Sequence, residues 1–198
     1  TFGRMNPPTV GHQKLVDKVI ATARRNNATP HIYLSHTQNS KKDPLDYNNK
    51  IKFAKKAFGN SVVRTSSRTI IEVMQELEKK YSDVILVVGS DRVQSFTELL
   101  NKYNGKDYTF DSIQVVSAGT RDPDAEGVSG MSASKLRELA KNGDEDTFKS
   151  GLPPKLSNAD KDQLYKAVRK GMMLEEIDFD IEAFVDELDI DTVELDES

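Results

Sequence analysis

The stretch Gly3-Arg4-Met5-Asn6-Pro7-Pro8-Thr9-Val10-Gly11-His12 decides how this chain begins to fold. Its two consecutive prolines lack the backbone N–H that a strand or a helix interior needs, so the chain must turn there. Beyond the turn, apolar residues recur at the spacing of one helix face, at Leu15, Val16, Val19 and Ile20. The stretch is therefore predicted to join a short strand to a helix.

The start of this helix favours an anion. The first backbone N–H groups of a helix have no partner within the helix, and the helix dipole is positive at that end. Gly11 has no side chain that would hold an anion at a distance, and His12 follows directly. By itself, the stretch fits a phosphate site and an ordinary proline turn before a helix equally well.

A second segment of the same kind lies late in the chain, at Ser132-Ala133-Ser134-Lys135-Leu136-Arg137. Ser132 is a good helix N-cap, and Ser134 falls in the first turn. Arg137 lies within reach of a ligand at that helix end, where its guanidinium can bind phosphate oxygens. A capped surface helix is the plain alternative for this segment.

Together the two segments resemble the two signatures of the nucleotidyltransferase superfamily, (His/Thr)-x-Gly-His and Ser-x-Thr/Ser-x-x-Arg. The resemblance covers residues 1–150, and the Gly-Arg and Gly-Met pairs before the motifs make the chain most similar to nucleotidyltransferase-like proteins of bacteriophages. It implies an α/β fold with a doubly wound parallel sheet, Rossmann-like and of the HUP type. Thr9 stands where many members have histidine, and Ser134 where many have threonine.

The resemblance also implies a reaction. A nucleoside monophosphate, AMP from ATP in the favoured case, passes to a phosphate-bearing small molecule and pyrophosphate leaves. The alternatives are a cytidylyltransferase that uses CTP and a catalytically silent nucleotide-binding or virion-associated protein. Mg²⁺ is expected as cofactor, bound mainly through the triphosphate, with no metal ligands from the protein.

By the same resemblance, His12, Thr9 and Arg137 are the expected catalytic residues. The expected nucleotide-binding residues are Gly3, Arg4, Asn6, Gly11, Lys42, Gly89, Asp91, Ser132 and Ser134. The Gly89-Ser90-Asp91 run is similar to one in dinucleotide-forming adenylyltransferases, although a strand that ends in Gly and Asp is also common. Lys41 and Lys42 fit a triphosphate and a solvated loop equally well. A nicotinamide acceptor would need an aromatic platform, for which Phe96, Tyr103 and Tyr108 are the candidates.

The remaining pattern alternates strands and helices, which indicates a parallel sheet with ligands at the carboxyl ends of its strands. Strands are predicted at residues 31–35, 61–64, 84–88 and 113–116, and helices at 11–26, 47–58, 70–81, 92–103, 132–141, 144–150 and 160–170. The apolar run 84–88 is typical of a strand buried on both faces and predicts the centre of the sheet. Only Thr1 and Phe2 precede Gly3, so we expect the first strand to be cut short.

Composition limits the class of protein. The 198 residues include no cysteine and three histidines, which leaves little scope for a zinc site or a disulfide framework. No run of about twenty apolar residues occurs, so we expect a soluble, cytoplasmic protein without a membrane contact, in the host cytoplasm if phage-encoded. No aromatic and basic platform for nucleic acid appears either.

Charge is distributed unevenly along the chain. Residues 175–198 hold twelve acidic side chains and no Lys or Arg, whereas the preceding residues carry 28 basic and 20 acidic ones, a net charge of +8. We therefore expect three parts: a nucleotidyltransferase domain (1–150), a helical extension (151–174) and an acidic amphipathic tail (175–198). The tail is either solvated or a contact for a second copy or another protein.

Overall fold

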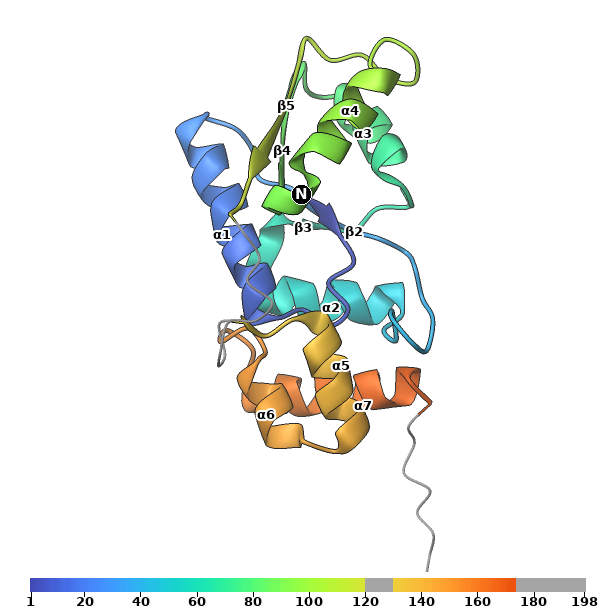
Figure 1. Cartoon of the computed structure of the whole chain (residues 1–198). Helices are drawn as coiled ribbons and strands as arrows, with labels where there is room; N and C mark the ends of the chain where they lie inside the picture. The colour runs from blue at the N-terminus through green and yellow to red at the C-terminus, as the bar shows by residue number, and fades with distance from the viewer. Residues whose placement is uncertain (120–129, 174–198) are drawn as a thin grey trace, which may run out of the picture.

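The computed structural model describes residues 1–119 and 130–173 (Figure 1). The predicted acidic tail, residues 175–198, lies outside these residues. The elements in chain order are β1 (Phe2–Gly3), α1 (Val10–Arg25), β2 (Ile32–Leu34), α2 (Tyr47–Phe58), the 3-10 turn η1 (Gly59–Ser61), β3 (Val62–Val63), α3 (Ile70–Glu78), β4 (Asp83–Val88), the 3-10 turn η2 (Ser90–Arg92), α4 (Val93–Tyr103), β5 (Ser112–Ser117), α5 (Ala133–Asn142), α6 (Glu145–Ser150) and α7 (Asn158–Gly171).

All strand pairings are parallel, as the alternating pattern predicts. β2 lies between β1 and β3, with Gly3 opposite Leu34 and Tyr33 opposite Val63. β4 pairs with β5 over six residues, from Asp83 opposite Ser112 to Val88 opposite Ser117. The α/β class with parallel strands and crossover helices, consistent with a Rossmann-like fold, is thus confirmed.

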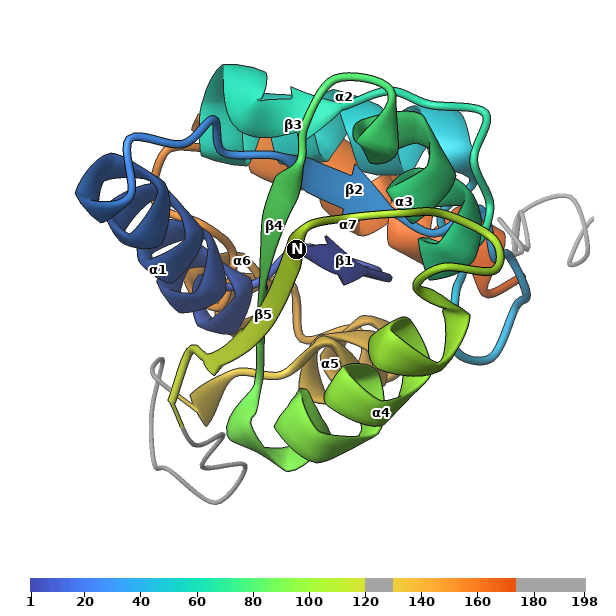
Figure 2. The same cartoon turned by 90° about the horizontal axis from the view of Figure 1, so that it is seen from above.

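The sheet has two parts, which the sequence did not indicate. Among the described residues β4 pairs with β5 alone, so it is not the hydrogen-bonded centre of one continuous sheet there, and its last three residues are the buried ones. β1 is two residues long and offers few backbone groups to another strand. Figure 2 shows β4 and β5 crossing over β1, with α1 on one side and α3 and α4 on the other.

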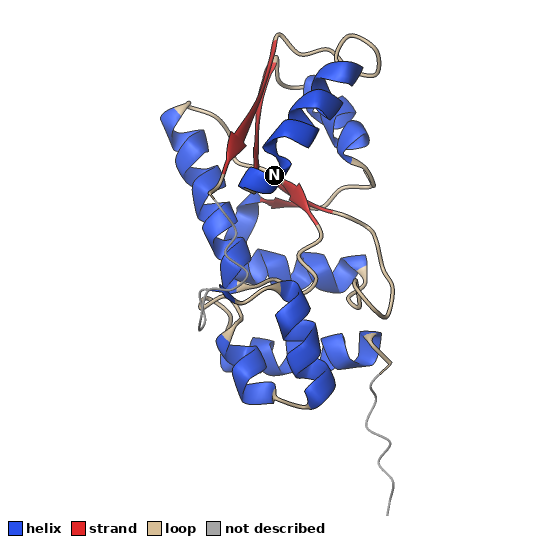
Figure 3. Ribbon diagram, in the orientation of Figure 1, coloured by secondary structure: helices blue, strands red, loops and turns tan. Residues whose placement is uncertain are grey.

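Two apolar clusters follow this division. The larger one joins β2 and α2 to the three C-terminal helices through residues such as Ile32, Phe53, Phe148 and Leu164. The smaller one packs Met74 of α3 and Leu100 of α4 against β4 and β5. In Figure 3 the strands gather in the upper half of the molecule and the lower half is helical, so the larger core connects the two halves.

Helix ends follow local sequence signals. Side-chain oxygens cap α1 (Thr9), α2 (Asp46), α3 (Thr69), α5 (Ser132) and α7 (Ser157). The last turn of α7 lies directly against the loop before α2, because a Cβ added to Gly171 would come within 2.0 Å of the Pro44 carbonyl oxygen. Within the described part of the chain, no helix combines the length and apolarity needed to cross a bilayer.

Candidate active site

The first loop is anchored by Asn6, at the cis peptide before Pro7. The side chain of Asn6 is buried, and its amide nitrogen donates to the carbonyl of Leu45 while its oxygen accepts from the Leu45 N–H, each at 3.0 Å. Both polar ends of the amide are therefore engaged with the backbone. The predicted role of Asn6 in touching nucleotide is not supported by this arrangement, which makes it a support for the loop.

Thr9 caps α1 rather than facing a ligand. It is 1% exposed, and its hydroxyl accepts from the backbone N–H of His12 at 3.2 Å. The N–H of Val10 donates to the carbonyl of Gly151 at 3.0 Å. The expectation of unpaired N–H groups at this helix start is therefore wrong for Val10 and His12, because the C-terminal helices and the cap both reach this end.

The capping contacts determine the tautomer of His12. Its Nδ1 accepts from the Thr9 backbone N–H at 3.1 Å, which completes a reciprocal capping box. An acceptor nitrogen carries no proton, so the proton of the neutral ring is on Nε2. His12 is half-buried at the start of α1.

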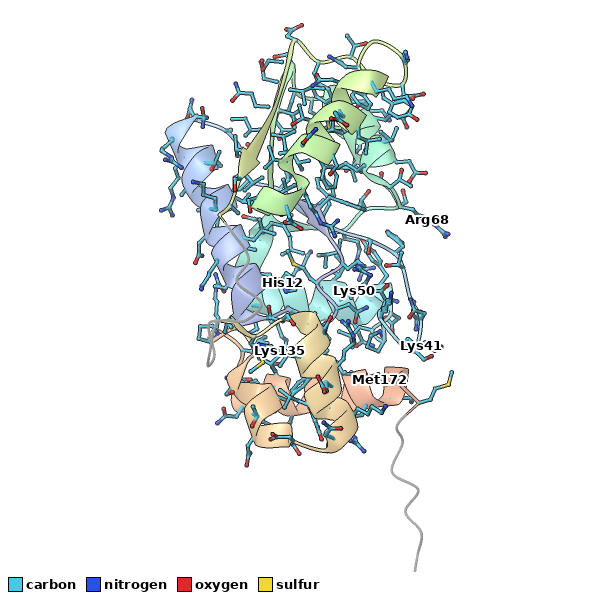
Figure 4. The ribbon with its side chains drawn as sticks, viewed as in Figure 1. His12, Lys41, Lys50, Arg68, Lys135 and Met172 are labelled. Carbon is cyan, nitrogen blue, oxygen red and sulfur yellow. The ribbon has the colours of Figure 1, made fainter. Side chains whose placement is uncertain are left out.

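The second motif lies directly against the first. Arg137 donates from Nη1 to the carbonyl of Asn6 at 2.7 Å and from Nη2 to the Ser134 hydroxyl at 3.1 Å. A Cβ added to Gly11 would lie 3.5 Å from the carbonyl oxygen of Met131, so α1 starts beside the residue that precedes Ser132. Figure 4 shows His12 and Lys135 near one another at the facing ends of α1 and α5.

Arg137 is half-buried and remains a cation. Burial lowers its pKa from the usual range, while the nearby Asp43 carboxylate raises it. Two of its five N–H donors serve Asn6 and Ser134, which leaves others for a ligand. Ser132, by contrast, uses its hydroxyl to cap α5 by accepting from the Lys135 N–H at 3.1 Å.

The loop after β2 carries exposed cations, and backbone hydrogen bonds hold its two ends together. Asn39 and Asp43 exchange two backbone hydrogen bonds, and the Asn39 side-chain oxygen accepts from the N–H groups of Lys41 and Lys42 at 3.1 and 2.7 Å. Both lysine side chains are exposed. Arg4, which follows β1 and Gly3, reaches this loop with its Nη1 at 3.7 Å from the Asp43 carboxylate.

Lys50 is a charged residue at this edge that sequence reasoning missed. It is 0% exposed, and its Nζ donates to the carbonyls of Ser35 and Thr37, the latter at 3.0 Å. Burial is the main reason that its pKa falls from 10.5 to about 8. Its position on the apolar stripe of α2, beside Ile51 and Ala54, was the available signal.

The predicted Gly89 and Asp91 lie on the other part of the sheet. The Ser90 N–H donates to the carbonyl of Gly119, which joins the ends of β4 and β5, and Asp91 is exposed beside Arg92 at 3.9 Å. Tyr108 is buried and donates to the Leu100 carbonyl at 2.7 Å, so it cannot be an exposed stacking platform.

Two surface hollows of the described residues lie away from the two motifs. One, of about 690 Å³, is lined by polar side chains of residues 65–79. The other, of about 380 Å³, lies between α1 and β5. Figure 4 shows Arg68, which lines the first hollow, well apart from His12. The candidate site is therefore an open edge where the first loop, the loop after β2 and the start of α5 meet.

The donors at this edge suit an anion. Guanidinium, ammonium, imidazole N–H and hydroxyl groups bind phosphate oxygens. No cluster of three or more His, Asp or Glu side chains able to hold a metal occurs among the residues that the structure describes.

Comparison with known proteins shows the family of the chain. The sequence model of the cytidylyltransferase-like family matches residues 1–139, which include both motifs and all five strands. The search of curated proteins found no significant match.

Proposed function

Because the chain belongs to the cytidylyltransferase-like family of the nucleotidyltransferase superfamily, we propose that it transfers a nucleoside monophosphate to a phosphate-bearing small molecule. Nucleotidyl transfer in general follows from the family. The finer proposal is that ATP is the donor and AMP the transferred group, by the similarity of Gly89-Ser90-Asp91 to a run in dinucleotide-forming adenylyltransferases.

One observation carries the proposal. Arg137 of the second motif donates to the Asn6 carbonyl of the first motif at 2.7 Å, and His12 of the first motif, whose Nδ1 accepts from the Thr9 N–H, lies at the start of the helix that follows. The Arg137 guanidinium and the His12 imidazole therefore lie at one edge. They bind phosphate in different ways, the guanidinium as a cation with paired N–H donors and the imidazole as a neutral N–H donor. A triphosphate is long enough to meet both.

The reaction needs little proton transfer. An anionic oxygen of the acceptor phosphate attacks the α-phosphorus, a new P–O bond forms, and the bond between the α-phosphorus and the bridging oxygen breaks. The electron pair leaves with pyrophosphate. The Nε2–H of His12 would donate to an α-phosphate oxygen as charge develops, and preorganised donors of this kind are worth about 10² to 10³ in rate.

The cations have a separate role. Arg137 with Ser134 would hold the β- and γ-phosphates, and exposed Arg4, Lys41 and Lys42 would neutralise the departing pyrophosphate. Mg²⁺, when bound to triphosphate oxygens, supplies further charge neutralisation. Asn6, Thr9 and Ser132 support the loop and the two helix starts rather than touching the nucleotide.

The test is pyrophosphate release from each of four nucleoside triphosphates with each of five acceptors. The acceptors are nicotinamide mononucleotide, phosphopantetheine, FMN, glycerol-3-phosphate and phosphocholine. Release that needs both an acceptor and His12 supports the proposal, and release from CTP but not ATP would replace the adenylyl assignment with the cytidylyl one. Tight triphosphate binding without release for any acceptor would favour a silent binding protein.

A further inference from the structure

Asp43 is a buried carboxylate at the edge of the site. Its side chain is 5% exposed, and Oδ1 is a buried oxygen with no hydrogen-bond partner among the described residues. Oδ2 accepts from the Asn39 side chain at 3.3 Å. A carboxylate buried with so few hydrogen bonds is costly unless cations surround it.

Three cations supply that surrounding charge. The Arg4 Nη1 lies 3.7 Å from Oδ2, and Lys50 and Arg137 are both close enough for the carboxylate to raise their pKa values. In turn, Arg4 lowers the pKa of both Lys50 and Arg137. Asp43 thus offsets repulsion between cations that come from three different segments.

The carboxylate is held firmly, whereas Arg4 is not. Asp43 exchanges backbone hydrogen bonds with Asn39, and the preceding part of its loop is tied to α2 by Lys50. The Arg4 side chain is 54% exposed, and 3.7 Å is beyond hydrogen-bonding distance. The Arg4 guanidinium and the Asp43 carboxylate are therefore held together by charge and not by a hydrogen bond. Arg4 can exchange the carboxylate for an anion of higher charge.

We propose that Asp43 is a positioning residue for nucleotidyl transfer, whose buried carboxylate holds Arg4 on the same side of the site as Arg137 so that both guanidinium groups meet one triphosphate. The inference rests on the proposed function. Asp43 acts through Arg4 and does not touch the nucleotide. A triphosphate carries more charge than a carboxylate and competes successfully for Arg4 when it binds.

The experiment is a double-mutant cycle with Arg4→Ala and Asp43→Asn, read by calorimetric binding of Mg·ATP and Mg·CTP. In the wild-type background, Arg4→Ala should weaken binding about 10-fold, the scale for one lost charged contact. In the Asp43→Asn background, Arg4→Ala should weaken triphosphate binding less than about 3-fold, because Arg4 is no longer held at the site by the carboxylate. Where an acceptor supports turnover, Asp43→Asn should raise the KM for triphosphate about as much as Arg4→Ala does, with a smaller change in kcat, because both changes remove Arg4 from the site.

Controls separate positioning from folding. Asparagine keeps the size of Asp43 and can still accept from Asn39, so the melting temperature should stay within a few degrees. Asp43→Glu keeps the charge and should retain part of the coupling, which provides a second variant if Asp43→Asn unfolds. Asp46→Asn removes a charge from the same segment while keeping a good helix cap for α2, and it should show no coupling to Arg4→Ala.

The outcomes are distinct. Losses that simply add between Arg4→Ala and Asp43→Asn would overturn the positioning role while triphosphate binding itself stands. Equal coupling in the Asp46→Asn control would show a general charge effect and would also overturn it. A wild-type protein that binds no triphosphate would refute the proposed function first, and the inference with it.

Discussion

The guanidinium of Arg137 donates to the carbonyl of Asn6 at 2.7 Å, across 131 positions of sequence. Asn6 is in turn bonded twice to the backbone of Leu45. The first loop, the segment before α2 and the start of α5 are thus tied together at one place. Changing any of the three should therefore affect the others.

His12→Ala should lower turnover by about 10² to 10³ while changing triphosphate affinity less, since one transition-state donor is lost. The measurement is steady-state pyrophosphate release with the best acceptor. Glutamine at this position can still complete a capping box with the Thr9 N–H. His12→Gln should therefore keep the melting temperature of the wild type and still be slow, and full turnover in either variant would contradict a catalytic role.

Arg137→Ala should weaken triphosphate binding by roughly 1.5 to 3 kcal/mol and monophosphate binding much less, because the contact to the distal phosphates is lost. Arg137→Lys should recover only part of the affinity, since an ammonium cannot reproduce the fork that reaches both Asn6 and a phosphate. Calorimetry with ATP and AMP measures the difference. Equal losses of affinity for ATP and AMP would contradict a contact to the distal phosphates and would show that Arg137 has a structural role.

Stability should rise with pH in the window set by Lys50. Burial lowers its pKa to about 8 in the folded protein, whereas the unfolded chain keeps the proton up to the ordinary value of 10.5. Between these values the unfolded state binds more protons, so the free energy of unfolding increases with pH, by an amount on the order of 1 to 3 kcal/mol.

The measurement for Lys50 is denaturant unfolding at several pH values for the wild type and Lys50→Met. Subtracting the two curves removes the contribution of other titrating groups. Lys55→Met, an exposed lysine on the same helix, is the matched control and should leave the wild-type slope unchanged. A difference curve that is flat from pH 7.5 to 10.5 would show that the Lys50 amine titrates normally.

Truncation before residue 175 should tighten ATP binding at low salt, if the twelve acids of the tail compete with phosphate for the basic edge. The described chain approaches that edge at its end, since Gly171 lies against Pro44, next to Asp43. The gain should shrink as salt rises, because the Debye length falls from about 30 Å at 0.01 M to about 8 Å at 0.15 M.

Binding isotherms for the full and truncated chains across this salt range are the measurement. Identical affinities at every salt concentration would remove the tail as a competitor. Light scattering of the two forms would then show whether the tail is a contact for a second copy, as the interleaved apolar residues of 175–198 allow.

Local features could be predicted from the sequence because their causes are local. Proline placement, capping residues and apolar spacing predicted where α1 and α5 begin, and the alternation of elements predicted the parallel pairing of β1, β2 and β3. The predicted start of the last helix, at residue 160, was two residues late, because its cap Ser157 was not recognised. The proximity of the two motifs was also predicted, and the contact between Arg137 and Asn6 agrees with it.

Only the tertiary structure decided what each polar side chain in those motifs does. Thr9 and Asn6 look like ligand contacts in the sequence, yet both are buried and bonded to backbone groups that arrive from elsewhere or from the helix itself. Asp43 and Lys50 look like loop and surface charges, yet both are buried beneath the edge. The physical reason is that burial and hydrogen-bond partners depend on chain segments tens of residues away, whereas helix caps and periodicity depend on neighbours within a few residues.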